Sequence, residues 1–159
     1  MSWLSRLWPA LAIPLGVGLG LGLFTFGYAE GFSYLGNAPA TCANCHIMNE
    51  QYDGWVKGPH EAVATCNDCH TPHDLVGKYT TKALNGYHHS KAFTAQDFAE
   101  PIAIKPANSR ILQDSCLSCH GELVHQAVAV PGRSDEVRCV HCHLTVGHGE
   151  RAGLGGPRS

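Results

Sequence analysis

Four pairs of cysteines, each followed by a histidine, are the residues of this chain with the clearest chemistry. Two residues separate the cysteines of each pair, and all eight cysteines are used: Cys42, Cys45, Cys66, Cys69, Cys116, Cys119, Cys139 and Cys142. Two thiols at this spacing can bond the two vinyl groups of a haem while the next histidine faces the iron. The sequence therefore predicts four covalently bound c-type haems.

Zinc sites and disulfides are the alternative uses of such pairs. Twenty residues separate Cys45 from Cys66 and nineteen separate Cys119 from Cys139, which fits a four-cysteine zinc site. A zinc ribbon does not need a histidine after every second cysteine. With 11 histidines in 159 residues, four such placements would arise by chance about once in 40,000. Disulfides are disfavoured because gaps of two residues are more typical of metal or prosthetic-group chemistry.

The histidines of the motifs are the expected proximal ligands of the haem irons. His70, His120 and His143 follow the last three cysteine pairs and are assigned to three haems. For the first haem, His46 and Met48 both remain candidates. A single turn does not easily present both side chains to one iron.

Histidines near the motifs are the expected distal ligands. His60 lies six residues before the second motif, and His148 lies five residues after the last one. At most one of the adjacent His88 and His89 can face a given iron. With two strong distal candidates for four haems, one iron is expected to be five-coordinate and another to take a ligand from a partner protein. The histidines expected to bond a propionate, or to be solvated or structural, are His73, His125 and His141.

The composition indicates a loop-rich domain with an unusual core. The charged fraction is 15% and the formal net charge is −2, which argues against nucleic-acid binding. About 130 residues remain for four haems once the apolar N-terminal stretch is set aside, so the haem planes themselves are expected to form the core. The 18 glycines and 9 prolines suit a loop-rich fold, with short helices and loops wrapped over the haems. The expected fold class is therefore mainly α with extensive loops.

A long apolar stretch near the N-terminus predicts a membrane anchor. The stretch from Leu7 to Ala29 has no charged residue and is long enough to cross a bilayer core of about 30 Å. Arg6 precedes it, so the positive-inside rule predicts a single pass through the bacterial cytoplasmic membrane with the haem domain on the periplasmic side. A cleaved signal peptide is the alternative, since Gly27 and Ala29 are small. The length of the apolar run favours an uncleaved anchor.

The spacing of the motifs predicts two dihaem half-repeats. Nineteen residues lie between the first two motifs, eighteen between the last two, and 45 in the middle gap. The expected domains are an anchor over 1–30, a tetrahaem cytochrome c domain over 31–148 and a mobile tail over 149–159.

The middle gap is expected to hold the longer helices. Asp74 is a candidate N-cap of one helix. The segment from Thr94 to Asp97 resembles a capping box that would begin a second, short helix, stopped by Pro101.

Several segments resemble the NapC/NirT family of membrane-anchored tetrahaem quinol dehydrogenases. The resemblance extends from the anchor to His148 and is more specific to the small subunits of cytochrome c nitrite reductase, whose compact length the chain shares. The segments that carry it are Cys42–Met48, Gly58-Pro59-His60, Val63–His73, Lys78, Lys82-Ala83 and Cys139–His148.

This resemblance implies specific roles near the first haem. Met48, rather than His46, would be its proximal ligand, and a quinol would bind beside its distal face. Lys82 would be a polar contact for the quinol. Family members have an acidic residue seven positions after this lysine, where this chain has His89. His89 could therefore ligate the iron or accept a proton from the quinol.

The resulting hypothesis is a quinol dehydrogenase with Lys82 and His89 as catalytic residues. The chain would oxidise menaquinol and pass the electrons to a periplasmic pentahaem nitrite reductase, whose catalytic subunit reduces nitrite to ammonium. The alternatives are a NapC-like quinol dehydrogenase for another periplasmic reductase and a membrane-tethered electron shuttle without a quinol site. A self-contained reductase is disfavoured because the sequence has no convincing cluster of Arg, Tyr and Lys for a substrate pocket.

Overall fold

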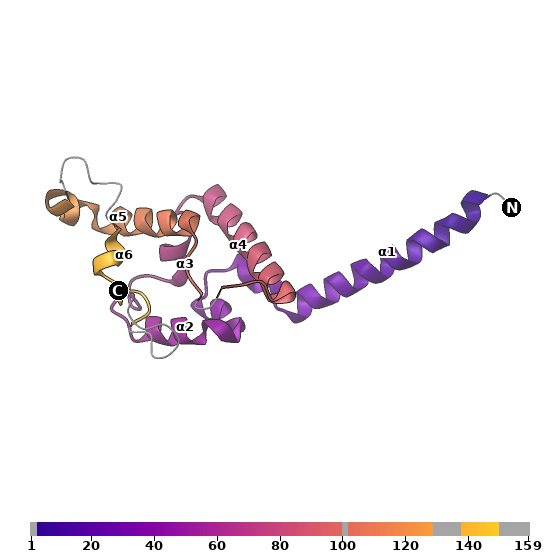
Figure 1. Cartoon of the computed structure of the whole chain (residues 1–159), viewed down its shortest axis with the longest axis horizontal. Helices are drawn as coiled ribbons and strands as arrows, with labels where there is room; N and C mark the ends of the chain where they lie inside the picture. The colour runs from indigo at the N-terminus through magenta and orange to yellow at the C-terminus, as the bar shows by residue number, and fades with distance from the viewer. Residues whose placement is uncertain (1–2, 100–101, 129–137, 150–159) are drawn as a thin grey trace. The chain divides into compact units, whose positions relative to one another are not determined.

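The computed structural model describes residues 3–99, 102–128 and 138–149. The chain divides into two compact units, Met1–Gly36 and Asn37–Ser159. All regular structure in the described residues is helical, without a strand (Figure 1). This confirms the expected mainly α fold class. The division into two dihaem half-repeats and the three domain boundaries stay predictions, and nearly all of the expected tail lies outside the described residues.

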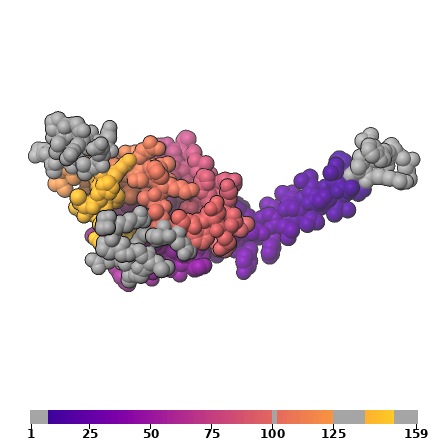
Figure 2. Space-filling view, viewed as in Figure 1, coloured from indigo at the N-terminus to yellow at the C-terminus, as the bar shows by residue number. Residues whose placement is uncertain are grey.

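The first unit is dominated by the apolar helix α1 (Trp3–Tyr28). Its residues Trp8–Tyr28 have a mean hydropathy of 1.8, and among the described residues this is the one helix long and apolar enough to cross a membrane. Its large apolar side chains are exposed, as Leu15 is at 75%. Figure 2 draws the atoms of this segment in indigo and purple. The expected apolar N-terminal helix is therefore confirmed. The helix is followed by the short 3₁₀ turn η1 (Gly31–Leu35).

The second unit consists of short helices joined by loops. Two 3₁₀ turns come first and five α-helices follow: η2 (Pro39–Asn44), η3 (His46–Met48), α2 (Asn49–Val56), α3 (Cys66–His70), α4 (Leu75–Ala95), α5 (Pro106–Val128) and α6 (Cys139–Cys142). The two longest helices of this unit are α4 and α5, and they occupy most of the gap between the second and third motifs, as expected.

Helix α4 begins where the sequence predicts and ends later. The carboxylate of Asp74 accepts a hydrogen bond from the backbone N–H of Gly77 at 2.7 Å, which confirms the predicted N-cap. The prediction of a second helix beginning near Thr94 is wrong, because α4 continues through Thr94 to Ala95. The Thr94 hydroxyl donates to the Ser90 carbonyl at 2.8 Å, one turn back in the same helix. Gln96, with φ 54°, then ends α4.

The second unit has almost no buried side chains. None of the apolar side chains in the described residues is buried, and the buried polar ones are Thr71 and Ser115, at 5% and 8% exposure. The Thr71 hydroxyl donates to the Asn67 carbonyl at 2.8 Å. Globular domains normally bury their Ile, Val, Leu and Phe side chains. The described residues of this unit therefore do not make an ordinary core by themselves.

Candidate haem sites

Each cysteine motif lies on or beside helical structure. The second motif forms α3, the third lies within α5, and the fourth begins with α6 and ends at His143. The first motif departs from this pattern, because it crosses from η2 to η3. Cys45 between them is extended, with φ −89° and ψ 113°. Three motifs therefore have the expected helical turn, and the first does not have it as one continuous turn.

The cysteines are available for covalent bonds. All eight are free thiols and none is fully buried. The described residues contain no group of three or more His, Cys, Asp or Glu side chains that could hold a metal ion. A structural zinc site needs about four such ligands around one point. The geometry therefore disfavours the zinc alternative and agrees with separate two-cysteine motifs.

The second motif is held in place by hydrogen bonds at both ends of α3. The backbone N–H and the hydroxyl of Thr65 both donate to the Asp68 carboxylate, at 2.7 and 2.8 Å. His73 Nε2 lies 2.9 Å from the backbone oxygen of Asp68. Since a carbonyl oxygen only accepts, this nitrogen carries the proton. The ring of His73 thus packs back onto the motif, and its predicted contact with a haem propionate stays a prediction.

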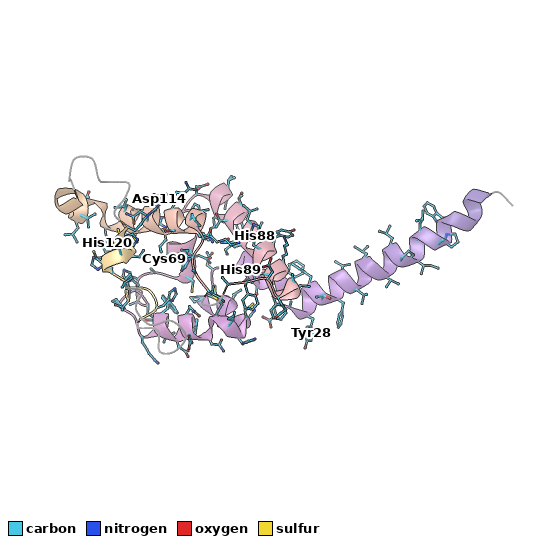
Figure 3. All side chains as sticks on the ribbon, viewed as in Figure 1. Tyr28, Cys69, His88, His89, Asp114 and His120 are labelled. Carbon is cyan, nitrogen blue, oxygen red and sulfur yellow. The ribbon has the colours of Figure 1, made fainter. Side chains whose placement is uncertain are left out.

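The four motifs contact one another in chain order. η2 packs against α3, α3 against α5, and α5 against α6. The thiols of Cys42 and Cys66 share a hydrogen bond, which lowers the pKa of Cys42 to about 7 and raises that of Cys66. Burial raises the pKa of Cys116, and Cys139 adds to this. Figure 3 marks Cys69 on α3 and His120 on α5, the middle of this series.

Two pairs of predicted ligands lie close together within the second unit, with interplanar angles of 19° for His70 and His148 and 81° for His60 and His120. The ring centres of His70 and His148 are 5.8 Å apart, and those of His60 and His120 are 6.1 Å apart. A ligating nitrogen lies about 2 Å from its metal and its ring centre about 1 Å farther, so two imidazoles on opposite sides of one iron have ring centres about 6 Å apart. Both pairs have this separation.

The protonation state of His70 suits a metal ligand. Burial lowers its pKa to about 4, and repulsion from His148 contributes. The imidazole is therefore neutral near pH 7, with a lone pair available for a metal. The orientation of the other ring of this pair, that of His148, is fixed by α2, because His148 Nδ1 lies 2.9 Å from the backbone oxygen of Gln51.

The remaining predicted ligands lie at helix ends. Met48 is half-buried and directly precedes α2, whereas His46 is exposed. His143 is exposed at the end of α6, and His141 within the same motif is exposed, as expected. The prediction for His125 concerns a side chain outside the described ones.

Lys82 interacts electrostatically with the first motif. Burial lowers the pKa of Lys82 and repulsion from Lys78 adds to this, while Cys42 acts in the opposite direction. Lys82 on α4 thus interacts electrostatically with Cys42 on η2. The Lys82 ammonium also lies 5.9 Å from the centre of the Tyr79 ring, which is within cation–π range.

His89 has different neighbours from Lys82. It lies two turns farther along α4 and is exposed (Figure 3). Desolvation lowers its pKa, followed by repulsion from Lys105 and then from His88. The interactions of His89 are thus with cationic groups of α4 and of the segment before α5.

Sequence reasoning missed the part that α2 takes in the site. The carbonyl of Gln51 contacts His148, and Gly54 lies against the backbone of the same histidine. A carbonyl group has no signature in the residue type. A glycine inside a short helix is the one signal that could have pointed here, since glycine disfavours helices.

These residues fit covalent haem. The thiols are free and near the surface, two histidine pairs have the separation of axial ligands, and apolar side chains are left uncovered for a flat apolar group. Together with α1, the motifs define a membrane-anchored c-type cytochrome with several haem-binding motifs.

Comparisons with known proteins agree with this class. Residues 6–101 match the NapC/NirT cytochrome c family, N-terminal region. The chain is 36% identical to the cytochrome c-type protein NrfH of Wolinella succinogenes, over 77% of this chain and 75% of that protein. It is 31% identical to the cytochrome c nitrite reductase subunit NrfH of Nitratidesulfovibrio vulgaris, over 76% and 72%. The chain belongs to the NapC/NirT cytochrome c family.

A solved structure supports the same fold. The chain is similar to one in the crystal structure of the cytochrome c nitrite reductase NrfHA complex bound to the HQNO inhibitor. The TM-score is 0.60 at 27% identity, and the match covers 87% of this chain and 90% of that one. The cytochrome c fold expected from the motifs is therefore confirmed.

We predict four covalent haems per polypeptide, one at each motif. Replacing both cysteines of the second motif, Cys66→Ala with Cys69→Ala, should leave three, because that haem loses both thioether bonds. Intact mass and haem absorbance per polypeptide measure the count. Ser118→Ala, a change between the cysteines of the third motif, is the control and should keep four. A double variant that still carries as many haems as the wild type would contradict the prediction.

Proposed function

We propose that this chain is the membrane-anchored, quinol-oxidising subunit of a periplasmic nitrite reductase complex. The observation that carries the proposal is the contact of the motifs in chain order. The first motif begins with Cys42, only fourteen residues after the last residue of α1, Tyr28. A relay of redox centres would thus begin close to the membrane in sequence and continue through the whole second unit.

The chain's own residues would hold the haems, which supply one-electron transfer when bound. The pair His70 and His148 would ligate the second haem, and the pair His60 and His120 the third. Their separations support this assignment. Met48 would ligate the first haem. His143, exposed at the end of α6, would ligate the fourth, with its second ligand supplied by the partner.

Menaquinol is the proposed substrate, and its site would lie beside the first motif. Oxidation to menaquinone releases two electrons to the relay and two protons to the periplasmic side. Lys82, which interacts electrostatically with Cys42, would stabilise the negative charge that develops on the quinol oxygen as the proton leaves. His89 would accept the proton and pass it to solvent, since its ring is exposed and imidazole exchanges protons readily near neutral pH.

The proposed electron acceptor is a periplasmic pentahaem catalytic subunit that reduces nitrite to ammonium. One similar protein is named a cytochrome c nitrite reductase subunit, and the similar solved structure is a complex, NrfHA. The chemistry of nitrite would lie wholly in the partner. This chain would contribute quinol oxidation, the relay and the membrane attachment.

We predict that the chain purified from membranes in mild detergent elutes with a pentahaem nitrite reductase. Adding a menaquinol analogue to the complex should reduce its haems and support nitrite-dependent turnover, and HQNO should block the reduction. A detergent extract of cells lacking the chain is the control for quinol-independent reduction. Elution with a different reductase would contradict the nitrite assignment but keep the quinol role. Failure of the quinol to reduce the haems would contradict both.

Lys82→Met should lower kcat/KM for quinol oxidation by about 10- to 100-fold, because it removes one electrostatic stabiliser of the developing charge. The haem content and the haem spectra should not change, since Lys82 holds no haem. Lys91→Met is the matched control, because Lys91 is exposed on the same helix; its activity should equal that of the wild type. Equal activities for the Lys82 and Lys91 variants would rule out the proposed role.

His89→Gln should lower the rate of quinol oxidation by about 100-fold at saturating quinol, the size typical of a lost general base. Its haem spectra should match those of the wild type. His88→Gln, at the neighbouring exposed position, should leave the rate nearly unchanged. A changed spectrum for one haem in the His89 variant would instead identify His89 as an iron ligand.

A further inference from the structure

We infer that helix α2 positions the axial ligand His148, and that Gly54 is the residue that makes this position possible. The inference rests on the proposed ligation of the second haem by His148, and it adds a positioning role for a helix that holds none of that haem's ligands. Two separate contacts between α2 and the segment at 147–148 carry it.

The first contact orients the ring of His148. Its Nδ1 lies 2.9 Å from the backbone oxygen of Gln51. A carbonyl oxygen can only accept, so Nδ1–H is the donor and Nε2 keeps its lone pair. Ligating histidines generally donate their other N–H to a carbonyl or carboxylate, which fixes the tautomer and the ring orientation. The Gln51 carbonyl is therefore placed as the outer partner of a metal ligand.

The second contact fixes the backbone of His148. A Cβ built on Gly54 would overlap the carbonyl oxygen of His148 and lie 3.0 Å from its Cα. Gly54 is three residues after Gln51, on the same face of α2. Just after the C-terminal end of α2, a Cβ on Gly58 would lie 3.7 Å from the Gly147 oxygen. The backbone of His148 thus lies directly against α2 at a position without a side chain.

The close approach of the His148 backbone explains why α2 has a glycine at position 54, where glycine would otherwise be unfavourable. Glycine inside a helix is destabilising relative to alanine, and α2 spans only Asn49–Val56. A methyl group at position 54 would have to displace either the helix or His148. The residue after Gly54 holds the helix in place, because Trp55 Nε1 donates a hydrogen bond to the Ala64 carbonyl at 3.0 Å. The segment that carries His148 is therefore the part that would move.

A displaced His148 backbone would withdraw its ring from the partner ring. The present separation of the ring centres of His70 and His148 is 5.8 Å, and a bond between nitrogen and metal tolerates only a few tenths of an ångström. Gly54→Ala should therefore leave the second haem with His70 alone, although neither cysteine nor histidine of its motif is changed.

The test uses the full-length holoprotein and three single variants. His148→Ala is the reference for loss of the ligand. Gly54→Ala should lose the same low-spin ferric signal in electron paramagnetic resonance, and its ferrous form should bind CO at one haem. Gly86→Ala, within α4, is the matched control, since a Cβ there has no atom within 4 Å; its spectra should match those of the wild type.

The double variant Gly54→Ala with His148→Gly distinguishes two effects of the Gly54 change: a displaced His148, and a general distortion of the haem site. If Gly54 acts only through His148, added imidazole should bind the open haem with the same affinity in His148→Gly and in the double variant. A weaker affinity in the double variant would show a general distortion and overturn the inference. It would also be overturned by wild-type spectra in Gly54→Ala. Wild-type spectra in His148→Ala would instead overturn the proposed ligation itself.

Discussion

The second unit depends on close contacts between short helices that carry cysteine motifs, because the polypeptide makes almost no apolar core there. None of the apolar side chains in the described residues is buried. The helices are held by polar and backbone contacts, such as the Gln113 side chain accepting from the Cys139 N–H at 2.9 Å. A chain of this kind needs a large apolar group to cover its side chains, and thioether bonds fix such a group relative to the backbone. Binding of the group and folding are then one process.

The same constraint explains why backbone contacts matter near the ligands. Where side chains form a core, a ligand can be positioned by packing of neighbouring side chains. Here the His148 ring is held by a carbonyl of α2, and its backbone lies on Gly54. Such contacts depend on small residues and on exact helix placement. The helix that provides them begins directly after Met48, so one short element connects the neighbourhoods of the first and second motifs.

The sequence was sufficient to predict those features that depend on the types and spacing of residues close together in the chain. The apolar helix, the cap at Asp74 and the cysteine motifs depend on residue type and spacing, and the structure has all three. Pairing of histidines far apart in the chain, such as His70 with His148, depends on tertiary contacts and could not be read from spacing. The failed prediction near Thr94 had the residues of a capping box. The first two of these residues, Thr94 and Ala95, instead continue α4, since the threonine hydroxyl donates to the preceding turn.

The first motif differs from the others in structure, and this difference bears on its chemistry. Its backbone is extended at Cys45, a methionine lies two residues after its histidine, and Lys82 interacts electrostatically with Cys42. The second motif, by contrast, is a regular helical turn with a half-buried, neutral histidine whose ring lies close to that of another histidine. Two imidazoles close both faces of an iron and suit it to electron transfer alone. A centre that must meet a substrate needs one accessible face and a nearby ionisable group. Among the four motifs, the first has the irregular surroundings that such a site requires.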